Sequence, residues 1–157
     1  MGKSFTHTAR RELPIEVVKK ALISFRNPSS WPDWNSGVKS MLATNAETLN
    51  ESDRLAVHQI IKGALIEVRW LVNSIKEGDG FCEIELMSQG QSRNERPIGS
   101  GLKKFKVCIT FLAQVDGGIE IHSSCEVSRF MSLFANRINA FMKKQCLQLL
   151  GDLSSLK

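Results

Sequence analysis

The sequence predicts an α+β fold in which a curved antiparallel sheet of about seven strands wraps around a long C-terminal helix. Two observations carry this prediction. Residues 127–153 repeat apolar side chains at the three- and four-residue spacing of one helical face. Most of the chain between residues 38 and 126 instead alternates apolar with polar residues, which is typical of antiparallel strands with one wet face. A sheet that curves around a helix has room for an apolar cavity between the two.

The expected element order is strand, two helices, six strands and a final helix. The first strand covers residues 4–13, and Pro14 suits the first turn of the helix that follows. Pro28 ends that helix, because the residue before a proline avoids the helical region. A short second helix then carries Trp31 and Trp34.

Six strands follow, joined by turns that are polar or rich in glycine. Their expected ranges are residues 38–44, 54–62, 65–75, 81–87, 103–114 and 119–126. Residues 89–101 contain three glycines and a proline without apolar periodicity, so we expect a long mobile loop there. Gly99-Ser100-Gly101 would be the hinge of this loop, which would act as a lid over the cavity.

Length and charge limit the classes of partner. The chain has 157 residues, and we expect residues 1–157 to form a single ligand-binding domain. The net charge of +5 comes from separated basic pairs without aromatic residues on an exposed basic face, so no nucleic-acid partner is expected. No apolar run reaches the roughly 20 residues that span a bilayer, so we expect no stable membrane insertion. A homodimer is compatible with the sequence.

The four cysteines are scattered, with no Cys-x-x-Cys pair and no histidine at metal-ligand spacing. We therefore expect neither a metal site nor a cofactor. The N-terminus lacks the apolar stretch of a signal peptide, and free thiols suit a reducing compartment, so a cytoplasmic location is expected.

The candidate ligand site is the inner face of the sheet together with the apolar face of the last helix. Its apolar members are Val68, Trp70, Ile84, Leu86, Phe105, Val107, Ile109 and Ile121 on the strands, and Phe134, Ile138 and Phe141 on the helix. The same positions are expected of a filled core, and the sequence does not separate the two interpretations.

Three polar residues share the phase of the inner face: His7, Lys103 and Ser123. Buried polar groups need hydrogen-bond partners, and a pocket with a few convergent polar groups is a typical ligand site. Each of the three could equally satisfy a structural hydrogen bond, and Lys103 could reach solvent from its strand end. Cys125 shares the phase of Ser123, and Asn139 and Gln145 border the apolar stripe of the final helix.

Two stretches carry a resemblance to a known family. Residues 13–18 read Leu-Pro-Ile-Glu-Val-Val, and residues 31–38 read Trp-Pro-Asp-Trp-Asn-Ser-Gly-Val. Together with the element order they resemble the START-like superfamily, whose members show W-x-x-W-x-x-x-V entering the second strand. The polyketide cyclase/dehydratase and lipid transport branch is the most similar. Residues 89–101 depart from the common pattern, being unusually long and charged.

The resemblance implies a helix-grip fold with a hydrophobic tunnel between the sheet and the last helix. It implies binding or transport of a small hydrophobic or amphipathic molecule, such as a lipid, a quinone or a polyketide-like compound. The alternative is an enzyme of the polyketide cyclase/dehydratase type that uses the same cavity. The superfamily shares no catalytic residue pattern, and His7 is the one candidate acid or base on the inner face. A third hypothesis is a protein-interaction module at Trp31 and Trp34.

Overall fold

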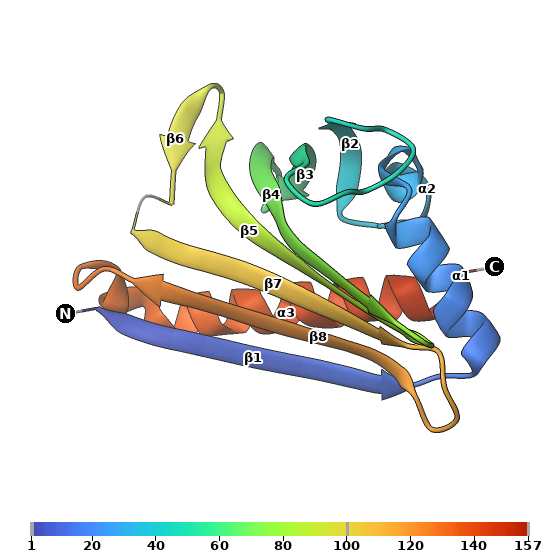
Figure 1. Cartoon of the computed structure of the whole chain (residues 1–157). Helices are drawn as coiled ribbons and strands as arrows, with labels where there is room; N and C mark the ends of the chain where they lie inside the picture. Colours follow the sequence, from blue (N-terminus) through green and yellow to red (C-terminus); the bar gives the residue numbers. More distant parts are fainter. Residues whose placement is uncertain (1, 100, 157) are drawn as a thin grey trace.

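The computed structural model describes residues 2–99 and 101–156 of the chain. Its centre is an antiparallel sheet with the spatial strand order β1-β8-β7-β5-β4-β3-β2, in which the short strand β6 pairs with β5. Figure 1 shows this sheet curving in front of α3, while α1 and α2 gather at one end of the molecule. The helix-grip architecture expected from the sequence is therefore confirmed.

The strands are β1 (Lys3–Glu12), β2 (Val38–Ala43), β3 (Arg54–Ile61), β4 (Ala64–Gly78), β5 (Phe81–Arg93), β6 (Arg96–Ile98), β7 (Leu102–Leu112) and β8 (Gly118–Val127). The helices are α1 (Ile15–Phe25), α2 (Trp31–Trp34) and α3 (Ala135–Ser154), with the 3-10 turns η1 (Pro28–Ser30) and η2 (Met131–Phe134). Within residues 2–99 and 101–156, none of the helices is long and apolar enough to cross a membrane. The first strand pairs with the last along its whole length, and α3 packs against both.

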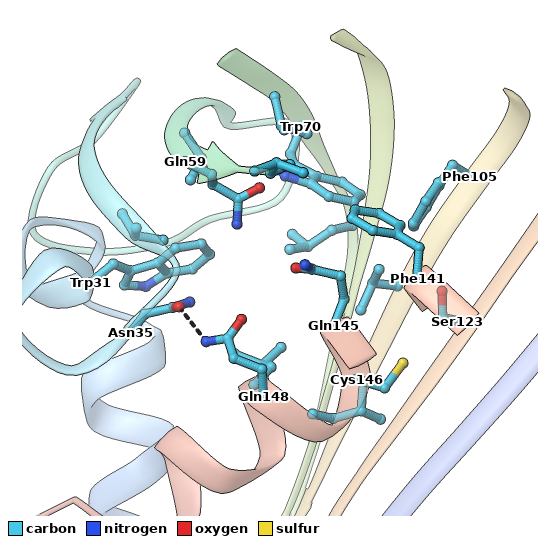
Figure 2. Close-up of a pocket in the computed structure, with 18 of the residues that line it drawn as sticks. Trp31, Asn35, Gln59, Trp70, Phe105, Ser123, Phe141, Gln145, Cys146 and Gln148 are labelled. Atoms are coloured by element: carbon cyan, nitrogen blue, oxygen red, sulfur yellow. Dashed lines mark hydrogen bonds between the residues drawn. The ribbon is translucent and has the colours of Figure 1, made fainter. Parts of the chain in front are cut away.

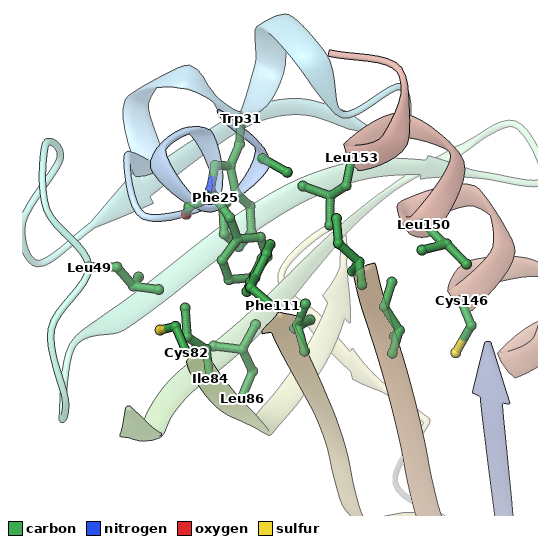
Figure 3. Packing of buried hydrophobic residues seen from close by; sticks show 14 of the residues in the cluster. Phe25, Trp31, Leu49, Cys82, Ile84, Leu86, Phe111, Cys146, Leu150 and Leu153 are labelled. Atoms are coloured by element: carbon green, nitrogen blue, oxygen red, sulfur yellow. Dashed lines mark hydrogen bonds between the residues drawn. The ribbon is translucent and has the colours of Figure 1, made fainter. Parts of the chain in front are cut away.

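The largest group of buried side chains lies where α1 and α2 cover the sheet (Figure 3). Phe25 is at its centre, with its ring 4.9 Å from the ring of Trp31 and 5.7 Å from that of Phe111. The indole N–H of Trp31 donates a 2.8 Å hydrogen bond to the carbonyl of Phe25. Leu153, near the end of α3, completes the packing with no exposed surface. We call this end of the sheet, built on these four residues, the closed end.

The final helix begins later than the apolar spacing predicts. β8 continues to Val127, which pairs with Lys3 on one side and Leu102 on the other. Phe130 and Leu133 are 71% and 78% exposed, so the apolar repeat before α3 is not a buried helical face. Apolar residues at the end of a strand can continue the three- and four-residue spacing of the helix that follows. The periodicity alone therefore placed the start of the helix too early.

The region predicted as a mobile loop is largely a β-hairpin. β5 extends into it, and β6 returns antiparallel after a two-residue turn at Asn94 and Glu95. Both turn residues have positive φ, 51° and 65°, as a type I′ hairpin turn requires. A bulge at Gly90, where φ is 126°, shifts the strand register and hides the period-two pattern.

The predicted hinge falls partly on Ser100, which lies outside the described residues. Gly101 is part of a packed corner. Its carbonyl accepts a 2.8 Å hydrogen bond from the backbone N–H of Ser128, and the side chain of Met131 lies against it. The start of β7 is therefore tied to the turn η2.

Candidate ligand cavity

An internal cavity of about 100 Å³ lies between the sheet and α3, beside the closed end (Figure 2). Aromatic side chains form much of its wall. The rings of Trp70 and Phe105 lie 5.7 Å apart and nearly perpendicular, at 81°. Figure 2 shows Phe141 of α3 beside them, with Trp31 on the opposite side of the cavity. The wall therefore offers flat apolar surfaces from both the sheet and the helices.

Carboxamides dominate the polar part of the lining. They are Asn35, Gln59, Gln91, Gln145 and Gln148. None of the described lining residues is an aspartate, glutamate, histidine, lysine or arginine. A carboxamide both donates and accepts hydrogen bonds without carrying a charge. The cavity is therefore chemically suited to uncharged polar groups.

Two of the carboxamides are engaged in holding the protein together. Gln148 donates to the side-chain oxygen of Asn35 at 2.9 Å, and the same oxygen accepts from the backbone N–H of Gly37 at 3.0 Å. Gln148 also donates to the carboxylate of Asp152. The backbone N–H of Ser36 donates to that carboxylate at 2.9 Å. These bonds fix the connection between α2 and β2 against α3.

Two other carboxamides are available to a ligand. Figure 2 shows the side chains of Gln59, from β3, and Gln145, from α3, extending toward the centre of the cavity. Both are half-buried, and neither side chain forms a hydrogen bond with another residue in the described part of the chain. A ligand that pairs with these amides gains hydrogen bonds without breaking any protein contact.

A hydroxyl and a thiol complete the polar lining, from Ser123 and Cys146. Burial raises the pKa of the Cys146 thiol, and a hydrogen bond with Ser123 acts in the opposite direction. A thiol with a raised pKa stays protonated at neutral pH and is a poor nucleophile. The thiol of Cys146 is therefore not an ionised nucleophile at neutral pH.

A second and more open groove of about 450 Å³ adjoins the cavity. We call it the outer groove. It is bordered by the β3–β4 turn, the β5–β6 hairpin, η2 and the first half of α3, and we call this the open end of the molecule. Ile61, Gln91, Phe105 and Phe141 line both spaces. These four side chains therefore lie between the inner cavity and the outer groove.

Most of the predicted site residues line one of these two spaces. Those in the cavity lining are Val68, Trp70, Leu86, Phe105, Val107, Ile121, Ser123 and Phe141. Phe134 and Ile138 line the outer groove instead, because α3 begins only at Ala135 and its first turns lie at the open end.

Four predicted residues line neither space. Ile84 and Ile109 have no exposed surface and belong to the packed core beneath the cavity. Lys103 is exposed near the start of β7. His7 is half-buried on β1, opposite Ser123 in the strand register. Because α3 packs directly on β1, an inner-face position there meets the helix rather than the cavity.

Apart from Gln145, which borders the apolar stripe of the final helix, the cavity carboxamides are the main residues that sequence reasoning missed. Gln59 had a usable signal, since it shares the inward phase of Leu55 and Val57 in β3. Gln91 had none, because the bulge at Gly90 breaks the alternation that would have placed it on the inner face. A polar residue in phase with buried neighbours is the pattern to look for.

No family model matches the sequence, and no curated protein matches it. Solved structures do match the fold. The major latex-like protein 151 from Panax ginseng superposes with a TM-score of 0.69 at 8% identity, covering 97% of this chain and 96% of that one. Norcoclaurine synthase from Thalictrum flavum, in complex with dopamine and hydroxybenzaldehyde, gives 0.65 at 9% identity, covering 98% and 85%.

A START superfamily protein from Mycobacterium smegmatis gives a TM-score of 0.50 at 11% identity, covering 93% of this chain and 98% of that one. Identities this low establish the fold alone. They confirm the helix-grip fold that the resemblance of residues 13–18 and 31–38 implied.

Proposed function

We propose that the protein binds a small apolar or amphipathic molecule that carries no formal charge. This proposal rests on the cavity lining, which is largely apolar and contains five carboxamides, with no charged side chain among its described residues. Ligand sites are mostly apolar with a few placed polar groups. A charged group of a ligand would lose its hydration on entering this cavity, and no opposite charge in the lining would compensate for that loss. A lipid alcohol, a quinone or a neutral polyketide-like compound has the required chemistry.

The volumes of the two spaces support a ligand that places its uncharged polar part in the inner cavity and extends an apolar part into the outer groove. The inner cavity of about 100 Å³ is smaller than the roughly 300–1,000 Å³ of most small-molecule sites. The outer groove adds about 450 Å³. Phe141 of α3 lines both spaces, so a ligand that extends from one into the other would contact its ring.

Binding is better supported than catalysis. Norcoclaurine synthase is an enzyme with this fold that holds dopamine and hydroxybenzaldehyde, so a reaction in such a cavity is a real alternative. A cyclase or dehydratase needs an acid or base within hydrogen-bond reach of its substrate. The described lining offers none, and His7 lies outside it. A carrier or a storage protein needs no such group.

We also propose that residues 1–157 act as one ligand-binding domain in a reducing compartment such as the cytoplasm. A single sheet carries the lining of both spaces. The four cysteines are free, which supports a reducing environment.

Binding of 2-naphthol and 2-naphthoate, measured by ligand fluorescence, tests the proposal. The two compounds share one ring system, and only the second is charged at neutral pH. We expect 2-naphthol to bind and 2-naphthoate to bind at least about tenfold more weakly, because the lining of the inner cavity has no cation to replace the lost hydration. Equal affinities would contradict a neutral ligand, and no binding of either would remove the cavity as a site for small aromatic compounds.

A matched pair of variants locates the binding. Gln145→Trp places an indole where the amide extends into the cavity, so 2-naphthol binding should be lost. Lys144→Trp adds the same ring at the neighbouring, exposed position and should bind normally. Retained binding in a folded Gln145→Trp protein would place the site elsewhere. Native mass spectrometry of the protein purified from its own organism would identify the natural ligand that it retains.

A further inference from the structure

Exposed apolar side chains lie in and beside the turn η2 and in β6, two elements that border the outer groove. Phe130 and Leu133 are 71% and 78% exposed, Phe134 is 40% exposed, and Ile98 in β6 is 36% exposed. The rings of Phe130 and Phe134 stack edge to face, 6.3 Å apart. We call these four residues the mouth surface. Exposed apolar residues are ordinary when scattered, but a cluster beside a groove marks an interaction site.

The charged side chains among the described lining residues of the outer groove are all basic. Lys62, Arg93 and Arg137 line the outer groove, and no acidic residue is found among its described lining residues. None of the three basic side chains forms an ion pair with another residue in the described part of the chain. Glu126, the acid in β8 nearest this end, is already paired with Lys104. Basic side chains beside exposed apolar ones are complementary to an anionic apolar interface.

We propose that the mouth surface docks on membranes that contain anionic lipids. Phe130, Leu133, Phe134 and Ile98 would enter the boundary between headgroups and acyl chains, and the basic side chains would meet lipid phosphates and carboxylates. Aromatic and aliphatic residues with lysine and arginine beside them form the usual composition of such interfacial contacts. The groove shares Phe105 and Phe141 with the inner cavity, so the docked protein would open its ligand path onto the bilayer.

Two other partners fit these residues less well. A nucleic acid would use the basic side chains and could stack on the phenylalanines, but it gives no reason for exposed Leu133 and Ile98. A second copy of this chain would bring three more basic side chains against the first three, and like charges oppose such an interface.

Co-sedimentation with lipid vesicles tests the proposal with the ligand-free protein. We expect binding to vesicles of phosphatidylcholine mixed with phosphatidylserine, weaker binding to phosphatidylcholine alone, and a decline as salt is raised. Leu133→Asp and the double change Arg93→Glu with Arg137→Glu should each lower the bound fraction, the double change by at least about tenfold. Because no cavity ligand is present, this result is independent of the proposed function.

Matched changes on α1 serve as controls, far from the groove (Figure 1). Ile23→Asp alters an apolar side chain that is 72% exposed, and Lys20→Glu reverses an exposed basic charge. Both should bind vesicles like the unmodified protein. No binding to the mixed vesicles, or an equal loss in the α1 and mouth variants, would overturn the proposal. If the unmodified protein did not bind the mixed vesicles, and Leu133→Asp instead abolished a dimer or an RNA complex, the mouth surface would serve that partner and the membrane proposal would be overturned.

Discussion

The two ends of the sheet use the same types of side chain in opposite ways. At the closed end, Phe25 and Phe111 are each 1% exposed and pack ring against ring. At the open end, Phe130 and Phe134 also form a ring pair but stand in solvent. The difference arises because α1 and α2 cover only the closed end (Figure 1).

This contrast separates stability from binding within one sheet. Buried aromatic packing lies at the closed end, and the cavity lies between that core and the open end. A protein that admits a ligand must open somewhere, and the regions that open are those with few buried apolar contacts. We therefore expect the open end to open more readily than the core at the closed end.

The largest expected effect is a loss of stability at the closed end alone. Phe111→Ala should lower the free energy of unfolding by about 3–5 kcal/mol, because it removes a buried ring and leaves a cavity. Phe134→Ala should change it by less than about 0.5 kcal/mol, since part of that ring is already in solvent. Urea unfolding followed by tryptophan fluorescence measures both. Similar losses in the two variants would show that the open end contributes equally to the fold.

A smaller effect distinguishes the carboxamides that hold the structure from those that face the cavity. Asn35→Leu removes a buried amide that Gln148 and the backbone of Gly37 use as an acceptor, so we expect a loss of about 1–3 kcal/mol in stability. Gln59→Leu removes an amide without such partners and should leave stability within about 0.5 kcal/mol.

Ligand affinity should depend on Gln59, although stability does not. Gln59→Leu is expected to weaken 2-naphthol binding, because the hydroxyl loses an amide partner in the cavity. If Asn35→Leu were as stable as the unmodified protein, its amide would have no structural role. If Gln59→Leu bound 2-naphthol at full strength, the cavity amides would not contribute to recognition.

The sequence predicted the sheet and its inward face well because alternation is a local property. Leu55 and Val57 in β3 are buried as their phase requires. Which inner-face residues lie at the cavity depends on contacts between elements, and the periodicity of a single strand does not show these contacts. His7 has the correct phase, but its place relative to the cavity depends on which strand α3 covers.

The open end was the least predictable part for the same reason. The strand continues there through a bulge at Gly90 and a turn in which Glu95 adopts positive φ, a conformation that favours glycine. Without a glycine pair at the turn, the hairpin has a weak sequence signal, and residues 89–101 looked like a loop. The outer groove and the mouth surface are built from this hairpin, so both were hidden at the level of sequence.

The smallest expected effect compares how often each end opens. Cys82 lies in the closed-end core, and Cys125 lies in a smaller cluster with Phe105 and Met142 toward the open end. The two thiols are 2% and 3% exposed, and burial raises the pKa of both above the ordinary value of 9.0. Alkylation therefore requires local opening at either site, and differences in rate report the opening free energy.

We expect iodoacetamide to label Cys125 about tenfold faster than Cys82, a difference of about 1.4 kcal/mol in opening free energy. Peptide mass spectrometry over a time course measures the two rates, and the urea-unfolded protein is the control in which they should converge. Equal rates in the folded protein would mean that both ends open together, so that the open end is not an independent unit.

The pH dependence of the same experiment has a definite sign. Because the folded pKa values of these thiols are raised, protonated cysteine is favoured in the folded state. The associated stability is present below pH 9.0 and is lost as pH rises through the folded pKa values. Labelling should therefore accelerate with pH at both sites. A Cys125 to Cys82 ratio that stays constant below pH 9.0 would show that opening, rather than thiol chemistry, distinguishes the two ends.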